Sequence, residues 1–247
     1  MSRYKALLFD LCDTLVTLNF SKLPTVAVNG QAIRSTSGLI YSILRESHPQ
    51  ITFEKFYSVL IETTRQLHLI RDEHHMEITS EHRFEKILKQ LGLHQIPETK
   101  ELLNRIISTH TDQIIQMMEF PESHRLFLKT CRQRYRFGIV SNFDHAATVY
   151  RVLERQGVRD LFEEILISAE VGWRKPRREI FQSALERMRL EPADTLFIGD
   201  RHDIDVVGAK QSGMAAAWLN PEDQPVRQDL PAPDLVIGSL GDLVDLP

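Results

Sequence analysis

The sequence predicts an α/β fold in which helices cover both faces of a parallel sheet. Short apolar segments typical of buried parallel strands alternate along the chain with amphipathic helical stretches. The strands are expected at 4–9, 137–140, 165–167, 195–198 and 215–219, and the helices between them at about 122–134, 145–156, 177–189 and 203–212. This alternation of strand and helix favours a Rossmann-like parallel sheet. A further short strand is expected at 233–237, followed by a last helical turn.

Several of these helices carry the residues that usually mark a helix end. Gly157 follows the second helix, Pro176 stands just before the third, and Gly213 follows the fourth. Glycine is common just past a helix and proline at its start, so these positions support the predicted boundaries.

Residues 17–118 break the alternation and predict a separate inserted domain. Apolar residues around Asn29-Gly30, within 25–33, are typical of a β-hairpin. Helical patterns follow at about 36–46, 52–70, 79–91 and 98–117. We therefore expect a core domain made of 1–16 and 119–247, and a flap hairpin with a helical cap over 17–118.

Composition excludes some function classes. The 247 residues suit one or two domains, and a net charge of −4 gives no overall attraction to nucleic acid or anionic membranes. Only two cysteines, Cys12 and Cys131, fit a reducing compartment rather than a disulfide framework. The apolar run at 6–9 is too short for a signal-peptide core or a membrane span. We expect a cytoplasmic protein with a small-molecule substrate, as a monomer or a homodimer.

Three acids follow predicted strands and predict a metal site. Asp10 ends the first strand, and Asp200 and Asp205 follow 195–198. In open parallel sheets, ligands bind beyond the carboxyl ends of the strands, so these acids converge if the two strands are neighbours. Two carboxylates ~4 Å apart repel by ~4 kcal/mol at a dielectric of ~20, which a cation such as Mg²⁺ would offset. The alternative, a simple helix cap, stays open for Asp203.

Further polar residues follow two other strands. Lys175 comes after the third strand, where it could pair with Asp10 and with a substrate anion. Ser141-Asn142 end the second strand, where a hydroxyl and amides could hold phosphate oxygens. Each has a plainer alternative: surface charge for Lys175 and a helix cap for Ser141-Asn142. The arginines at 174, 177 and 178 are interpreted as a solvated loop rim.

Together these residues resemble the haloacid dehalogenase superfamily. Its four motifs occur in the family order, each after a predicted strand, as Phe9-Asp10-Leu11-Cys12-Asp13-Thr14-Leu15, Ser141-Asn142, Lys175-Pro176 and Gly199-Asp200-Arg201-His202-Asp203-Ile204-Asp205. The match covers 4–15 and about 119–240, and it is specific as a set although no single motif is.

The resemblance implies a role for each residue. Asp10 would be the nucleophile and form a covalent aspartyl intermediate. Mg²⁺ would be held by Asp10, Asp200 and Asp205 and by the backbone carbonyl of Cys12. Ser141, Asn142 and Lys175 would bind the transferring group, with Lys175 also among the catalytic residues. The insert would be the family's helical cap of the first type, which closes over the site.

Cys12 departs from the family pattern. Family phosphatases place a second aspartate there as general acid and base, and a glycine at the position of Asp13. Loss of general acid–base catalysis costs roughly 10²–10⁴ in rate. A thiol, with an ordinary pKa of ~8.5, is a poor substitute for a carboxylic acid. Asp13 is expected to point to the opposite face of the strand.

Three functions follow from this departure. The first is a Mg²⁺-dependent phosphatase of reduced activity or with an easy leaving group. The second is a hydrolase of carbon–halogen or carbon–phosphorus bonds, since such family members also lack the second aspartate. The dehalogenases, however, carry an aromatic residue there and lack the acid pair of Asp200 and Asp205, so these acids favour phosphoryl transfer. The third is a binding protein that has lost catalysis.

Overall fold

The computed structural model describes residues 3–246 and contains a six-stranded, entirely parallel sheet. The spatial order is β10-β9-β8-β1-β6-β7. The strands are β1 (Ala6–Phe9), β6 (Arg136–Ser141), β7 (Glu164–Ile167), β8 (Thr195–Gly199), β9 (Ala215–Leu219) and β10 (Leu235–Ile237). β1 lies between β6 and β8, which confirms the predicted α/β sheet and the adjacency on which the acid cluster depends. The chain continues on opposite sides of β1, and such a switch point is where open α/β sheets bind ligands.

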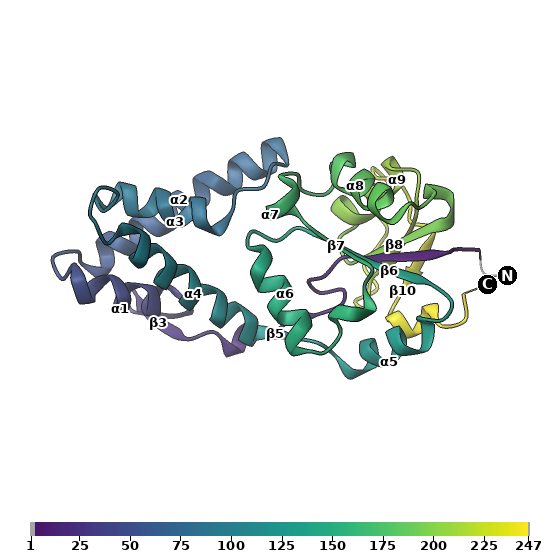
Figure 1. The fold of residues 1–247 in the computed structure, drawn as a ribbon, viewed down its shortest axis with the longest axis horizontal. Helices are drawn as coiled ribbons and strands as arrows, with labels where there is room; N and C mark the ends of the chain where they lie inside the picture. Colours follow the sequence, from purple (N-terminus) through teal and green to yellow (C-terminus); the bar gives the residue numbers. More distant parts are fainter. Residues whose placement is uncertain (1–2, 247) are drawn as a thin grey trace.

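Helices cover both faces of this sheet, as the right side of Figure 1 shows. Alternate residues of β1 point to opposite faces, so Leu7 and Phe9 belong to one apolar core and Leu8 to another. α5 (Glu122–Cys131) and α6 (Ala146–Arg155) complete the first core. α8 (Arg178–Met188) and α9 (Val207–Gln211) complete the second. The short α7 (Ser168–Val171) follows β7 directly.

The inserted segment forms a helical cap, on the left of Figure 1, with an apolar core of its own. The elements are β3 (Thr25–Val28), β4 (Gln31–Arg34), α1 (Ser37–Ser47), α2 (Phe53–His74), α3 (Ser80–Gln90) and α4 (Thr99–Met117). β3 and β4 pair around Asn29-Gly30, so the predicted hairpin is confirmed. Both residues have positive φ, as this turn requires. β2 (Thr17–Leu18) and β5 (Met118–Glu119) pair antiparallel where the chain enters and leaves the cap.

Three helices differ from their predicted extents. α5 ends at Cys131 rather than near residue 134. α2 continues to His74 rather than ending near residue 70, because Arg71 and Glu73 are good helix formers. The helix stops at His75, which takes the left-handed conformation. The predicted helix over 203–212 begins instead with a π-helical turn at His202–Val206, ahead of α9. Turns of this kind often occur at functional sites.

Within residues 3–246, the structure contains no helix that is both long and apolar enough to span a membrane.

Close packing of α8 against α9 makes Gly208 sensitive to substitution. A Cβ built on Gly208 would lie 2.2 Å from Cε2 of the buried Phe181, so Gly208→Ala must displace a ring in a closely packed core. We expect a loss of about 1–3 kcal/mol in the free energy of unfolding, measured by urea denaturation. Gly238→Ala is the matched control, since its new Cβ would come no nearer than 3.8 Å to another atom, and equal losses in the two variants would contradict this packing.

Candidate active site

The ends of β1 and β8 bring three carboxylates together. Asp10 directly follows β1, and its backbone N–H donates to the carbonyl of Ile198 at 2.9 Å, which aligns the ends of the two strands. Asp200 directly follows β8, and Asp205 lies in the π-helical turn after it. One oxygen from each acid lies within 4.8 Å of the others, and Asp10 and Asp205 are buried.

The backbone after β8 is shaped to hold this cluster. Gly199 has no side chain, and a Cβ there would lie only 2.3 Å from Oδ2 of Asp205. The π-helical turn carries Asp205 back toward the strand end, where Oδ2 accepts a hydrogen bond from the Arg201 N–H at 3.1 Å. Thr14 Oγ1 donates to Asp200 Oδ1 at 3.3 Å. Glycine is therefore required at position 199 because a carboxylate occupies the space of its side chain.

Lys175 places a positive charge among the acids. Its Nζ lies 2.5 Å from Asp10 Oδ1 and 2.8 Å from Asp205 Oδ1, and its side chain is only 1% exposed. Burial would by itself lower the pKa of this ammonium, but the carboxylates of Asp10 and Asp205 outweigh burial and raise the pKa of Lys175 above its ordinary value. Lys175 is therefore charged at neutral pH and bridges two of the three acids.

One ammonium does not balance three carboxylates. Burial, together with the charges of Asp10 and Asp205, raises the pKa of Asp200 to about 7. Burial also raises the pKa of Asp205 to about 6, although Lys175 acts in the opposite direction. Carboxyl groups held at such pKa values bind either protons or a cation. The donors are all hard oxygens, so the set of three acids fits Mg²⁺.

Ser141 and Asn142 lie at the end of β6, next to this cluster in the sheet. Ser141 is 1% exposed, and its Oγ has no hydrogen-bond partner within residues 3–246. Buried hydroxyls are normally paired, so this Oγ is suited to a ligand oxygen, although Ser141 itself is not among the residues that line the cleft over the acids. Asn142 has a different arrangement: its Oδ1 accepts from the Lys175 N–H at 2.7 Å, and its Nδ2 donates to the Lys175 carbonyl at 3.0 Å. The Asn142 side chain therefore fixes the Lys175 loop.

Cys12 and Asp13 lie in the turn after β1, and both line the cleft over the acids. Burial, and then the charges of Asp10 and Asp13, raise the pKa of the Cys12 thiol well above its ordinary value, so Cys12 stays protonated. The prediction that Asp13 points to the far face of a strand is wrong, because β1 ends at Phe9. Asp13 has left-handed backbone, φ 57°, which explains why glycine suits this position, and its Oδ1 accepts from the Leu18 N–H at 3.2 Å.

The cleft over the acids has a volume of about 220 Å³ and also includes residues for which the sequence predicted no role in the site. Asp10, Cys12, Asn142, Lys175, Asp200 and Asp205 line it, together with Asp13, Arg174, Arg201 and Ile204. Interpretation of Arg174 as part of a solvated rim is wrong, since its side chain is only 23% exposed and pairs with Glu77 of the cap. The position of Arg174 directly before Lys175 is the one feature of the sequence that could have placed Arg174 in the cleft. No sequence pattern indicated Glu77.

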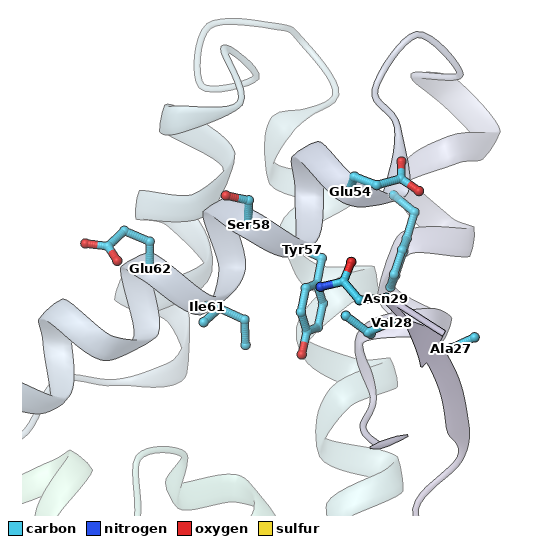
Figure 2. A pocket seen from close by; sticks show the side chains of 9 residues that line it. Ala27, Val28, Asn29, Glu54, Tyr57, Ser58, Ile61 and Glu62 are labelled. Carbon is cyan, nitrogen blue, oxygen red and sulfur yellow. The ribbon is translucent and has the colours of Figure 1, made fainter. Parts of the chain in front are cut away.

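The cap carries a larger hollow of about 440 Å³ between the hairpin and the first half of α2. Figure 2 shows Tyr57 and Ile61 of α2 on the same side as Asn29 and Val28 of the hairpin, with Glu54 and Glu62 at the two ends of this stretch of the helix. None of its lining residues lines the catalytic cleft.

Comparison with known proteins identifies relatives along most of the chain. A family model described as haloacid dehalogenase-like hydrolase matches residues 48–219. The glyceraldehyde 3-phosphate phosphatase of Pyrococcus furiosus is 28% identical over 219 residues, which is 89% of this chain and 82% of the relative. The pyrimidine 5'-nucleotidase YjjG of Escherichia coli is 35% identical over 120 residues, 48% of this chain and 52% of the relative.

A solved structure extends the likeness to the whole fold. The 2-haloacid dehalogenase of Pseudomonas syringae pv. Tomato has a TM-score of 0.73 at 22% identity, over 98% of this chain and 97% of that chain. Sheet order, helical cap and family match agree: the chain belongs to the haloacid dehalogenase-like hydrolases. The protein is accordingly an enzyme of the hydrolase class.

The raised pKa values of Asp200 and Asp205 predict how metal-free protein responds to pH. From about pH 4 to pH 7 the unfolded chain has released these protons while the folded protein still holds them, so stability falls as pH rises through that window. Asp200→Asn removes one of the two groups. In EDTA, we expect the wild type to lose more thermal stability than Asp200→Asn between pH 5 and pH 8.

Addition of Mg²⁺ provides the second half of the same measurement. At pH 8, Mg²⁺ should raise the melting temperature of the wild type by mass action and should do so much less for Asp200→Asn. Asp203→Asn is the matched control, because Asp203 pairs with Arg201 outside the acid cluster and should behave as wild type. Equal responses in all three proteins would contradict a metal site at Asp200.

Proposed function

We propose that the protein is a Mg²⁺-dependent phosphatase that acts on a small phosphorylated metabolite through an aspartyl-phosphate intermediate. The observation that carries the proposal is the buried group of Asp10, Asp200, Asp205 and Lys175 at the ends of β1 and β8. The names of the relatives, glyceraldehyde 3-phosphate phosphatase and pyrimidine 5'-nucleotidase, support a phosphate monoester as substrate.

In the proposed reaction, a carboxylate oxygen of Asp10 attacks phosphorus, the ester P–O bond breaks, and the leaving oxygen departs as an anion that takes its proton from solvent. A water molecule then cleaves the aspartyl phosphate, which releases phosphate and restores Asp10. Lys175 holds Asp10 in place and, with Ser141 Oγ, binds the phosphoryl oxygens. Asp10, Asp200 and Asp205, with the backbone carbonyl of Cys12, would hold Mg²⁺, which supplies positive charge for the phosphoryl group.

The proposal also assigns a part of the reaction to each of two domains. Residues 1–16 and 119–247 form the catalytic core, and residues 17–118 form the cap with its hairpin. The separate apolar core of the cap and the narrow β2–β5 connection support this division. A cap joined in this way closes over the cleft and excludes water during the reaction.

Replacement of the nucleophile gives the direct test. Asp10→Asn removes the attacking carboxylate, so turnover of p-nitrophenyl phosphate with Mg²⁺ should fall to the background rate, measured as p-nitrophenol release. Asp203→Asn keeps the cleft carboxylates and should retain activity. Undiminished turnover in Asp10→Asn would remove Asp10 from the mechanism, and halide release from 2-haloacids that persists in EDTA would favour dehalogenation instead.

Restoration of an acid at position 12 tests the proposed weakness of the site. A protonated thiol of raised pKa is a poor proton donor to a leaving group. Cys12→Asp should therefore raise kcat for an unactivated alkyl phosphate such as glycerol 2-phosphate, measured as released phosphate, by at least roughly tenfold, toward the 10²–10⁴ typical of general acid–base catalysis. Cys12→Ser, which adds no acid, should leave kcat near the wild-type value. A flat or lower rate in Cys12→Asp would mean that another group supplies the proton.

A further inference from the structure

The cap contributes a buried carboxylate at its junction with the core. Glu77 lies in the loop between α2 and α3, and its side chain is only 1% exposed. Within the cap, Glu77 Oε1 accepts from the Ile78 N–H at 2.9 Å and lies 3.0 Å from a guanidinium nitrogen of Arg71. Its other oxygen, Oε2, faces the core, where it accepts hydrogen bonds from Ser168 Oγ and Arg174 Nη1. One cap carboxylate therefore bonds to two separate core segments.

The first core partner leads to the loop that follows Ser141. Ser168 Oγ donates to Glu77 and at the same time accepts a hydrogen bond from the Phe143 N–H at 2.9 Å. Phe143 follows Ser141 and Asn142 directly in the chain. Glu77 is thus one side chain away from the backbone of the loop that presents the unpaired Ser141 hydroxyl.

The second core partner leads to the loop that carries Lys175. Arg174 lines the catalytic cleft and immediately precedes Lys175. The backbone of this loop also joins the cap: the Arg174 N–H donates to the His75 carbonyl at 2.9 Å, and the Glu77 N–H donates to the Gly172 carbonyl at 2.9 Å. The cap loop therefore forms a short antiparallel bridge with the segment that leads to Lys175.

The two core loops are also bonded to each other through the Asn142 side chain, which pairs with both backbone polar groups of Lys175. Glu77, Ser168, Arg174 and Asn142 thus connect the cap loop with both core loops. We infer that Glu77 is a positioning residue: through its contacts, the docked cap holds the two loops that carry Ser141 and Lys175 in their observed geometry. The inference rests on the proposed function, in which these loops bind the transferring phosphoryl group.

A second cap glutamate provides a matched comparison at the same junction. Glu81 lies 3.4 Å from His145 Nε2 of the core, with its side chain 45% exposed. It has the same charge and also bridges cap and core, but it contacts neither Ser168 nor Arg174 in the contacts of residues 3–246. Glu81→Gln therefore removes a cap–core contact that touches neither Ser168 nor Arg174, whereas a positioning role predicts an effect on the two loops only for Glu77.

Hydrogen exchange measures the effect on the loops without substrate. In Glu77→Gln, amide exchange at Phe143 and Lys175 should accelerate by roughly tenfold or more, because both amides depend on the network that Glu77 holds. In Glu81→Gln these amides should exchange at the wild-type rate. Ser168→Ala keeps every charge and should accelerate exchange at Phe143, but it removes the acceptor of the Phe143 N–H directly. Glu77→Asp, which keeps the charge but shortens the reach to Ser168 and Arg174, is therefore the second test if Glu77→Gln does not fold, and it should accelerate exchange at both amides. Unchanged loop exchange in Glu77→Gln or in Glu77→Asp, or an equal change in Glu81→Gln, would overturn the inference.

Binding of orthovanadate, a mimic of the transferring phosphoryl group, measures the consequence for the site. Glu77→Gln should weaken inhibition of p-nitrophenyl phosphate turnover by orthovanadate and lower kcat/KM, each by roughly 10- to 100-fold, as when residues that support reacting groups are lost. Glu81→Gln should change neither value. A normal orthovanadate inhibition constant in Glu77→Gln would overturn the inference. Absence of phosphatase activity in the wild type would contradict the proposed function, while loop exchange still decides the role of Glu77.

Discussion

Repulsion among carboxylates that the sheet forces together is the constraint on which the rest of the site depends. Hydrogen bonding between β1 and β8 fixes Asp10 beside Asp200, and the turn after β8 returns Asp205 to the same place. Neither strand end can move away without loss of sheet pairing. The structure offsets part of the repulsion with Lys175, a fully charged ammonium 2.5 Å from Asp10 and 2.8 Å from Asp205. Burial, together with the remaining negative charge, raises the pKa values of Asp200 and Asp205, and this buried negative charge suits the site to a hard cation.

Lys175 can perform this role only if its loop is held rigidly, because a misplaced ammonium would leave two buried carboxylates without a partner. The loop has three supports. Asn142 bonds to its backbone, Arg174 joins it to Glu77, and the cap loop pairs with its approach from Gly172. The electrostatic balance of the core thus extends into the position of the cap. In a hydrolase of this architecture, such a link makes the docked cap and the loops that carry Ser141 and Lys175 parts of one cooperative unit.

Sequence reasoning predicted the sheet, its helices and the convergence of Asp10, Asp200 and Asp205, because strand-end positions in a parallel sheet follow from apolar periodicity and chain order. It failed where a residue's environment depends on packing between distant segments. Asp13 leaves the strand in a left-handed turn, and the π-helical turn at 202–206 replaces an ordinary helix start, since Asp205 must reach back to the strand end. Arg174 and Glu77 meet across 97 residues, and no local pattern encodes such a pair.

Cys12 narrows the chemistry that this charge distribution can support. Burial and the neighbouring acids raise the pKa of the Cys12 thiol, so the thiol stays protonated. The same raised pKa makes the thiol a weak acid toward the leaving oxygen. Asp13 also lines the cleft, but one oxygen of its carboxylate accepts from the Leu18 N–H, which engages this side chain with β2. Under the proposed mechanism, attack by Asp10 is fully supported while protonation of the leaving group is not. Substrates whose leaving oxygen departs readily as an anion therefore benefit most from this site, whereas unactivated alkyl phosphates, which need an acid, benefit least.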